Sequence, residues 1–238
     1  MKNYSSNKGF TLAEVLITLA IVGVVAAITV PTLVANYQQK ALNNQFKKSY
    51  AFINQALLST IGDFGYIPQC YYRASDNSYI HSSNDCTAIR EKFFSKMKIS
   101  RICEGNAYAD GCIPEYEGMD TVANANNPDA EVPEGYESYG DYASRGCTFF
   151  QKDQILNDRT VYVVSDGTII IQYASTINII AVDINGLKGP NKWGYDLFSF
   201  MLKFDGSRFY YDGGGCMYAE KGGIGTATMI LRLQRNQL

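Results

Sequence analysis

Histidine and tryptophan are nearly absent from this chain of 238 residues, which contains one of each. Because His81 is the only imidazole, a metal site built from several histidines cannot form within one chain. Basic residues are not in excess either: 21 Lys and Arg face 23 Asp and Glu, which argues against a nucleic-acid-binding protein. At 46% hydrophobic residues the chain is too apolar to be disordered, and its length suits one sizeable domain or two small ones.

Catalytic signatures are missing as well. The sequence has no G-x-S-x-G, no H-E-x-x-H and no glycine-rich phosphate loop. The glycines at 213–215 and 222–223 lack a strand-to-helix context and are interpreted as turns. We therefore expect a protein that is not an enzyme and has no cofactor, with an exported enzyme using His81 as the less favoured alternative.

The apolar residues gather near the N-terminus. Of the 21 residues at positions 10–30, 16 are apolar. A helix of this length spans about 31 Å, the thickness of a bilayer's hydrocarbon core. The nine polar residues before it include Lys2 and Lys8, and positive charge there keeps the N-terminus in the cytoplasm. The pattern predicts a single-pass anchor with the remainder of the chain exported.

Two other interpretations of this segment explain less of it. A secretory signal peptide would be cut after Leu33-Val34-Ala35, but its apolar core is usually only about 7–15 residues long. A plain anchor explains the length but not Glu14, since a carboxylate at the bilayer centre costs about 2.5–3.5 kcal/mol. An intramembrane carboxylate by default indicates a functional site whose partner must be found.

The start of the apolar segment carries a recognisable string of residues. It reads Lys8-Gly9-Phe10-Thr11-Leu12-Ala13-Glu14-Val15-Leu16. This string resembles the leader junction of type IV pilins and type II secretion pseudopilins. The resemblance implies that a prepilin peptidase cuts between Gly9 and Phe10 and methylates the new N-terminus at Phe10. It also implies that Glu14 pairs with the N-terminal amine of a neighbouring subunit, which suits a carboxylate in need of a cation. The simpler alternative is that Glu14 caps the first turn of an anchor helix.

The resemblance also implies partners and a location. The partners would be the prepilin peptidase, other pilin or pseudopilin subunits packed through their N-terminal helices, the inner-membrane assembly platform and membrane lipid, without direct contact to nucleic acid. The protein would sit in the inner membrane with its globular part in the periplasm or outside the cell. It would join a filament after assembly.

The helix is expected to continue beyond the membrane, over positions 10–62, for about 78 Å. One amphipathic face is formed by residues mostly three or four apart, namely Leu33, Tyr37, Leu42, Phe46, Tyr50, Ile53 and Leu57. The opposite face is polar and contains Asn43, Asn44, Lys47, Lys48, Asn54 and Gln55. Gly23 and Pro31 are weak points, where the helix could bend or where Pro31 could mark the membrane exit. Gly62 is a plausible stop.

Positions 63–150 form an irregular insertion with six cysteines shared between it and the following region. One short helix is predicted there, capped by Asn84 or Asp85, with an apolar face of Ile89, Phe93, Phe94 and Met97. Between positions 102 and 144 the chain has ten acidic residues and no Lys or Arg. Such a run is usually solvated surface, although an acidic loop could also bind cations or a basic partner.

Positions 151–238 are predicted to form an antiparallel β-sheet. Two hairpins are expected, 160–164 with 168–173 across Asp166-Gly167, and 197–204 with 207–211 across Asp205-Gly206. A further strand is expected at 177–184. A sheet packed against the half of the long helix that lies beyond the membrane buries the apolar faces of both. The fold class is therefore α+β, with the pilin-like arrangement of a long helix and a head.

A second string lies between the predicted strands. The segment from Val182 to Phe198 resembles a D-x-N-G, G-P-N, G-x-D-x-F segment of many pilin-like proteins. Oxygens from Asp183, Asn185 and Asp196 could converge on Ca²⁺ if the loop folds back. The pattern departs from an EF-hand, because Leu187 stands where an oxygen ligand belongs and no Glu closes the loop. The alternative is a structural turn in which Asp183 and Asn191 bond backbone amides.

All six cysteines lie beyond the long helix, as expected for a chain exported to an oxidising space. Six cysteines allow 15 pairings. Proximity in sequence favours Cys70 with Cys86 and Cys103 with Cys112, which leaves Cys147 with Cys216. A zinc site is less favoured because no pair has C-x-x-C spacing.

Together these observations predict a subunit of a type IV pilus or type II secretion pseudopilus, trimmed at its leader and assembled through its N-terminal helix. The alternative from another class is a membrane-anchored exported binding module, such as a filament-tip adhesin, which the large irregular insertion favours over a compact repeating subunit.

Overall fold

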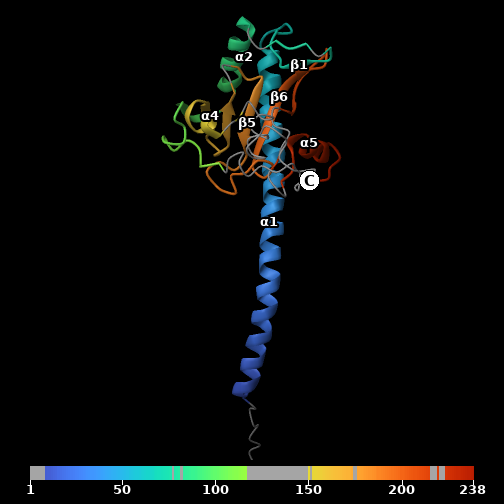
Figure 1. Ribbon diagram of the computed structural model, residues 1–238. Coiled ribbons are helices and arrows are strands. Elements are labelled where there is room, and N and C mark those ends of the chain that lie inside the picture. The colour runs from blue at the N-terminus through green and yellow to red at the C-terminus, as the bar shows by residue number, and fades with distance from the viewer. Residues whose placement is uncertain are drawn as a thin grey trace, which may run out of the picture. The chain divides into compact units, whose positions relative to one another are not determined.

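The computed structural model describes residues 9–76, 78–80, 83–116, 150, 152–173, 176–214, 219 and 223–238. The helices are α1 (Leu12–Gly62), α2 (Asn84–Ser95), α4 (Lys152–Asn157) and α5 (Thr226–Gln234). The strands are β1 (Arg73–Ala74), β2 (Ile99–Glu104), β3 (Thr160–Val164), β4 (Ile169–Gln172), β5 (Ile179–Asp183), β6 (Leu197–Phe204) and β7 (Phe209–Gly213). Figure 1 labels most of them along the chain.

Helix α1 is continuous over 51 residues, or about 76 Å, and ends at Gly62 as predicted. Pro31 lies inside it and the helix continues through that residue. The chain divides into two compact units, Met1–Ala41 and Leu42–Leu238, so the boundary falls within α1. The second unit, called the head below, contains the sheet and all the other helices.

The head is built on one sheet of seven strands in the order β1-β6-β5-β4-β3-β2, with β7 also paired to β6. Both predicted hairpins are present: β3 pairs antiparallel with β4, and β6 with β7. The α+β class is confirmed, but the sheet is mixed rather than purely antiparallel, because β1 runs parallel to β6. Two of its strands, β1 and β2, come from the segment interpreted as irregular. Their pairing partners lie far along the chain, where local sequence pattern carries no signal.

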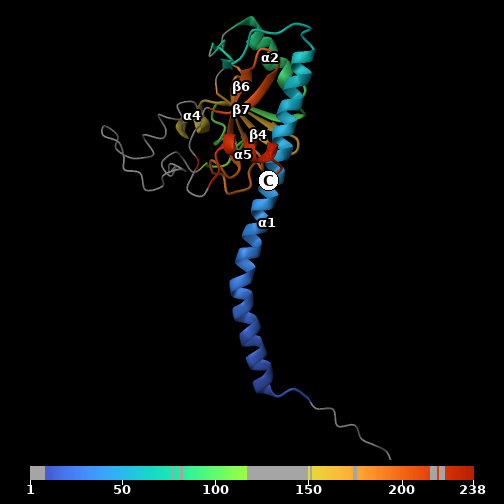
Figure 2. The ribbon, with the colours of Figure 1, turned by 90° about the vertical axis from the view of Figure 1, so that its right-hand side faces the viewer.

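The central strands are buried on both faces. In β4, Ile169 and Ile171 face one apolar cluster while Ile170 faces another. The cluster that contains Ile170 includes residues of α1 and α2, and the cluster that contains Ile169 and Ile171 includes Ile155 of α4. Figure 2 accordingly shows α1 and α4 on opposite sides of the sheet. Burial on both faces explains why these strands are continuous runs of Ile and Val rather than alternating ones.

The part of α1 within the head packs against the sheet through the predicted apolar face. Phe46, Ile53 and Leu57 are fully buried, and the Phe46 ring meets the Phe198 ring edge-on, with centroids 4.8 Å apart. Asn54 departs from its predicted place on the polar, solvated face. Its side-chain oxygen accepts a hydrogen bond of 3.2 Å from the backbone amide of Tyr211 in β7.

Helix α2 lies where a short helix was predicted, and Ile89, Phe93, Phe94 and Met97 are buried. The cap differs: Ser83, not Asn84 or Asp85, accepts a hydrogen bond from the Cys86 amide. The carboxylate of Asp85 instead accepts from the Tyr66 hydroxyl at 2.9 Å and from the Gln69 amide at 2.7 Å. It therefore fixes the connection between α1 and α2. Helices α4 and α5 have no counterpart in the sequence-based prediction.

Candidate functional site

The leader junction lies directly before α1. Phe10 is 88% exposed, and a Cβ added to Gly9 would meet nothing within 4 Å. The fold of this chain therefore places no demand on a glycine at position 9. A requirement for a small residue there would come from an enzyme that binds the junction.

Thr11 and Glu14 form a reciprocal cap at the start of α1. The Glu14 carboxylate accepts from the Thr11 amide and the Thr11 hydroxyl, both at 2.8 Å, and the Thr11 hydroxyl accepts from the Glu14 amide at 3.3 Å. This is the capping box, in which a Glu three residues after Thr satisfies amides that have no partner in the helix. The cap-like alternative for Glu14 therefore describes its contacts within one chain. Pairing with a neighbouring subunit's amine concerns a second chain and stays a prediction.

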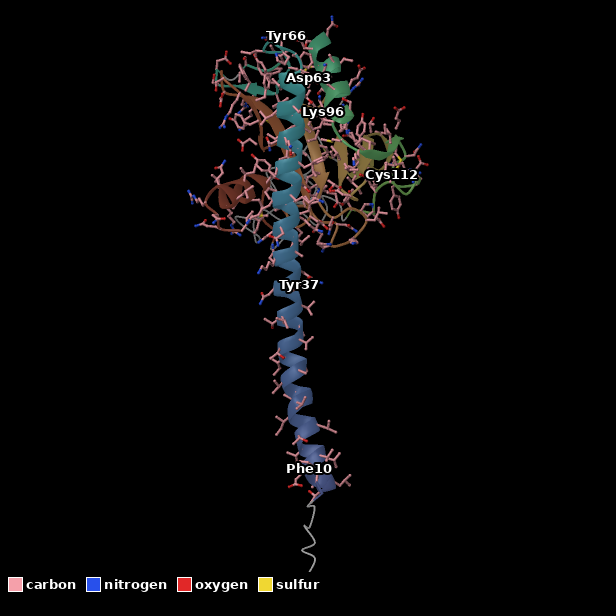
Figure 3. The ribbon with its side chains drawn as sticks, turned by 180° about the vertical axis from the view of Figure 1, so that it is seen from behind. Phe10, Tyr37, Asp63, Tyr66, Lys96 and Cys112 are labelled. Atoms are coloured by element: carbon pink, nitrogen blue, oxygen red, sulfur yellow. A yellow bond between two sulfur atoms is a disulfide. The ribbon has the colours of Figure 1, made fainter. Side chains whose placement is uncertain are left out.

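The first part of α1 exposes its apolar side chains. Among the described residues, α1 is the one helix long and apolar enough to cross a membrane, and none of its most apolar 18-residue window is buried. Phe10 and Tyr37, both labelled in Figure 3, are 88% and 74% exposed. Such a surface in water is unfavourable, so this helix requires lipid or other helices around it.

The loop after β5 is organised by Asp183. Its side chain is fully buried, and one carboxylate oxygen accepts from the amides of Asn185 and Gly186, at 3.1 and 2.8 Å. Its other oxygen accepts from the Tyr116 hydroxyl at 3.0 Å. Asp183 therefore bonds backbone amides as the structural-turn interpretation predicts, and Gly186 supplies the positive φ of 68° that the turn needs.

Asp196 organises the other end of the same loop. Its two oxygens accept from the amides of Asn191 and Lys192, both at 2.7 Å. The turn interpretation assigned this role to the Asn191 side chain, but Asn191 contributes its amide and Asp196 is the acceptor. The Ile184 amide also donates to the Asp196 carbonyl oxygen at 2.9 Å, which joins the two ends of the loop.

The two carboxylates form a buried pair. Burial raises the pKa of Asp183 well above its usual range, and the nearby Asp196 carboxylate raises it further. Burial likewise raises the pKa of Asp196, against the opposing effect of its backbone hydrogen bonds. Two like charges out of water favour the uptake of a proton or a cation.

Unsatisfied oxygens border this pair. The side-chain oxygens of Asn185 and Asn191 are buried and accept no hydrogen bond within the described part of the chain. Amide and carboxylate oxygens together are a donor set that Ca²⁺ accepts. No group of three or more His, Cys, Asp or Glu residues that could hold a metal occurs among the described residues. A cation here would therefore depend on the asparagine oxygens as well as on the carboxylates.

Tyr116 is a member of this site that sequence reasoning missed. Its ring is 2% exposed, and burial raises the pKa of its hydroxyl well above the usual range, as does the adjacent Asp183 carboxylate. It reaches the loop because the disulfide between Cys103 and Cys112 and the buried Ile113 hold its segment on the sheet. Its separation of 67 residues from Asp183 left no local signal.

Two disulfides have the pairing predicted from proximity. Cys70 is bonded to Cys86 and Cys103 to Cys112, with Cα separations of 5.0 and 6.5 Å. The first joins the segment after α1 to α2, and the second closes a turn after β2. The third predicted pair, Cys147 with Cys216, lies outside the described residues, as does most of the acidic segment.

Comparison with known proteins identifies the N-terminal segment. Residues 4–30 match the family model of the prokaryotic N-terminal methylation motif, the cleavage and methylation signal of type IV pilins and pseudopilins. No curated protein and no solved structure matches the chain. The motif supports a pilin-like or pseudopilin type of protein, and together with the apolar helix α1 it indicates one that is membrane-anchored and exported. The motif implies processing by a prepilin peptidase and assembly with other pilin subunits.

Proposed function

We propose that this protein is a subunit of a type IV pilus or type II secretion pseudopilus and acts mechanically rather than as an enzyme. Prepilin peptidase cuts between Gly9 and Phe10, and the mature chain stays anchored in the inner membrane with its head in the periplasm. The assembly platform then moves it into a filament of packed N-terminal helices. The observation that carries this proposal is the methylation motif at residues 4–30, which extends into the exposed apolar part of α1.

In this proposal Glu14 exchanges one set of donors for another. Within one chain it accepts from Thr11, which keeps the carboxylate hydrogen-bonded in an apolar environment. Cleavage creates an α-amine on Phe10, and a neighbouring subunit would bring that cation to the carboxylate. Because an ion pair in a low-dielectric setting is much stronger than one in water, the exchange favours subunits in register.

Processing provides the first test. Intact-mass analysis and N-terminal sequencing of the membrane-associated protein should give a chain that starts at Phe10 with one added methyl group. Gly9→Leu should abolish cleavage and Gly9→Ala should only slow it, since the peptidase needs a small residue at the cut. Gly23→Leu is the matched control, because a Cβ there also meets nothing within 4 Å. A chain that begins at Met1, or after Ala35, would refute the proposal.

Glu14→Gln separates the two roles of Glu14. Glutamine can occupy the same position of a capping box, so cleavage, membrane insertion and the helix start should be preserved. It carries no charge, so the neighbour's amine loses its partner and the amount of protein in sheared filaments should fall at least tenfold. Incorporation equal to that of the unmodified protein would show that Glu14 acts as a cap and not in assembly.

A membrane-anchored exported binding module, carried at a filament tip, is the alternative that stays open. In that case the chain would be processed in the same way, but it would be present in few copies per filament. Quantitative mass spectrometry of sheared filaments distinguishes a major subunit from one that is present only at an end.

A calcium ion held between Asp183 and Asp196 is a second proposal, supported by the buried carboxylate pair and by two asparagine side-chain oxygens that accept no hydrogen bond from the described residues. If calcium binds, the protein should melt at a higher temperature in calcium than in chelator. The free energy of unfolding should rise by about 2.7 kcal/mol when calcium is in hundredfold excess over its Kd. Asp183→Asn should remove this response, because it takes away the charge while keeping the size.

Asp205→Ala is the matched control for the calcium experiment. Asp205 also accepts backbone amides of a turn, from Ser207 and Arg208, but its turn is exposed and has no second carboxylate. The Asp205→Ala variant should lose stability and keep the calcium response. Melting that is indifferent to chelator before and after Asp183→Asn would leave the loop as a structural turn. Equal shifts in magnesium would indicate general screening of acidic residues, since Mg²⁺ demands a tighter octahedral shell.

A further inference from the structure

A cavity of about 560 Å³ opens on the head between α2 and the residues that follow α4, both labelled in Figure 1. Arg90 and Phe94 of α2, Glu104 of β2 and Arg159 beyond α4 contribute to its wall. Its volume lies within the range of about 300–1,000 Å³ that small-molecule sites occupy. The cavity is far along the chain from the leader junction and shares no residue with the loop of Asp183 and Asp196.

The charges of the wall are mixed. The wall includes two basic residues, Arg90 and Arg159, and three acidic residues, Glu91, Glu104 and Asp158. An anionic ligand such as a phosphate would meet the three carboxylates, and a cationic ligand would meet the two guanidiniums. A neutral ligand whose groups both donate and accept hydrogen bonds suits this wall, because it can pair with both kinds of side chain.

Aromatic rings supply the apolar part of the wall. The Tyr162 ring stacks on Phe94, with centroids 3.5 Å apart and planes 11° from parallel. The Tyr173 ring lies 4.6 Å from the centre of the Arg159 guanidinium. These contacts hold the rings in place, and the electron-rich face of a fixed aromatic ring attracts the weakly positive C–H groups of a ligand.

Arg159 has a donor that the described residues leave unused. One of its terminal nitrogens donates to the Gln154 side-chain oxygen, while its Nε is buried and without an acceptor in the described part of the chain. Burial lowers the pKa of Arg159, yet a guanidinium remains charged at physiological pH. A buried donor of this kind is costly, and because the Nε atom is not accessible from the cavity, a ligand hydroxyl can accept from it only when the Arg159 side chain turns toward the ligand.

We propose that this cavity binds a neutral saccharide, with its hydroxyl groups paired to Arg159, Arg90 and the carboxylates, and its C–H face against the tyrosines. A sugar ring combines vicinal donors and acceptors with an apolar face, which is the combination that the wall offers. The source is either a free sugar or the terminal residue of a surface glycan. The proposal concerns the head alone and does not depend on filament assembly.

The test uses the full chain in a detergent without a sugar headgroup, such as lauryldimethylamine oxide. Saturation-transfer NMR with maltose, lactose, cellobiose and N,N′-diacetylchitobiose should give transfer to at least one of them, with a Kd of about 1 mM. Methyl glycosides of the same hexoses distinguish the source, because a glycan's terminal residue has no free anomeric hydroxyl. Binding of the methyl glycoside equal to that of the free hexose indicates a glycan end, and loss of binding indicates a free sugar.

Variants tie the signal to the cavity. Arg159→Gln should weaken binding about tenfold or more, as expected for the loss of a charge-assisted hydrogen bond. Arg208→Gln is the matched control, because its guanidinium also lies over a tyrosine ring, Tyr210 at 5.6 Å, but outside the cavity. Glu91→Gln provides a second test if Arg159→Gln fails to fold, since the Glu91 side chain is 69% exposed and its loss should still weaken binding severalfold.

Three results would overturn the proposal. One is that no saccharide binds while melting shows a folded head. Another is that binding is unchanged in both Arg159→Gln and Glu91→Gln, or falls equally in Arg208→Gln. The third is that sulfate, spermidine or free glycine displaces the bound saccharide, which would show that the cavity selects a charged or zwitterionic ligand.

Discussion

The two parts of α1 place similar side chains in opposite environments. Before Leu42, large apolar residues such as Leu19 and Ile28 are 63% and 69% exposed. From Leu42 onward, residues of the same kind, such as Ile53 and Leu57, are fully buried against the sheet. One continuous helix therefore has a part whose apolar surface is covered by its own chain and a part whose apolar surface is not.

This difference indicates which covering each part requires. The part within the head gains its stability from the sheet, so its side chains are set by packing within one molecule. The large apolar side chains of the first part are exposed instead. In the proposed function they meet lipid in the membrane and other helices in a filament, and exposed apolar side chains suit both surroundings.

The disulfides give the largest expected effect, and they lie entirely on the head side of the comparison. Replacing both pairs, Cys70 with Cys86 and Cys103 with Cys112, by serine should cost about 5 kcal/mol, which approaches the whole stability of a small domain. The emission of Trp193, the single tryptophan, reports unfolding because its ring is 2% exposed in the core. The α1 part before Leu42 should keep its helix in detergent, and loss of helix there would break the distinction between the two parts.

A matched pair of leucines tests the comparison within α1 itself. Leu57→Ala should destabilise the head by about 2–5 kcal/mol, since it removes a fully buried side chain and leaves a cavity. Leu19→Ala should leave the unfolding midpoint of the head unchanged in detergent, because Leu19 is 63% exposed. Denaturant titration followed by Trp193 emission measures both. A shift of equal size from Leu19→Ala would mean that the two parts share one core.

Local pattern was sufficient for features that local physics decides. The apolar spacing located α1 and its buried face, Gly62 located its end, and Asp166-Gly167 located a hairpin. It was insufficient where the partner lies far along the chain. The parallel pairing of β1 with β6, the contact of Tyr116 with Asp183 and the bond from Asn54 to β7 each join distant segments. The predicted cap of α2 was wrong for a related reason, because the Asp85 side chain instead makes tertiary contacts with Tyr66 and Gln69.

The site shows the same division. The motif around Gly9, Phe10 and Glu14 could be recognised from sequence because its residues are continuous along the chain, as in a segment that a peptidase binds. The loop ends, Asp183 and Asp196, were also found, since turns select Asp near Gly and Asn. Which oxygen accepts from which amide depends on how the loop closes on the sheet, and that closure also involves Tyr116. The spacing of these residues in the sequence does not indicate how the loop closes.

The pH dependence of the head should reveal the buried carboxylate pair. Since burial raises the pKa of Asp183, the folded state binds this proton more tightly than the unfolded state, whose aspartate pKa is about 3.9. Its contribution to stability is therefore present at low pH and is lost as pH rises through the folded pKa. Asp63 has the opposite sign, because the hydrogen bond of 2.6 Å from Lys96 lowers its pKa. Both residues are labelled in Figure 3.

Asp183→Asn isolates this effect from the other carboxylates. In chelator, the stability of the variant relative to the unmodified protein should rise as the pH increases above about 4, by at most about 1.4 kcal/mol per pH unit. Thermal melting across this range at constant ionic strength measures the difference. A relative stability that stays level would show that Asp183 is ionised in both states and that no proton is held there.

The smallest expected effect concerns the ion pair between Lys48 of α1 and Asp166 in the turn between β3 and β4. The Lys48 ammonium lies 2.7 Å from the Asp166 carboxylate, but 67% of the lysine side chain is exposed. An exposed pair contributes about 0–1 kcal/mol and weakens with salt, so Lys48→Ala should shift the unfolding midpoint only slightly, and less at high salt.

Asp166→Ala should cost more than Lys48→Ala, because it also removes the acceptor of the Thr168 amide, 3.1 Å away, and with it a turn hydrogen bond of about 1 kcal/mol. The difference between the two variants should persist at high salt, since a hydrogen bond to a turn amide is screened far less than an exposed ion pair. Equal losses that both vanish with salt would show that the ion pair alone joins α1 to this hairpin. A salt-independent remainder in Asp166→Ala only would show that the turn hydrogen bond from Thr168, and not the ion pair with α1, accounts for the larger loss.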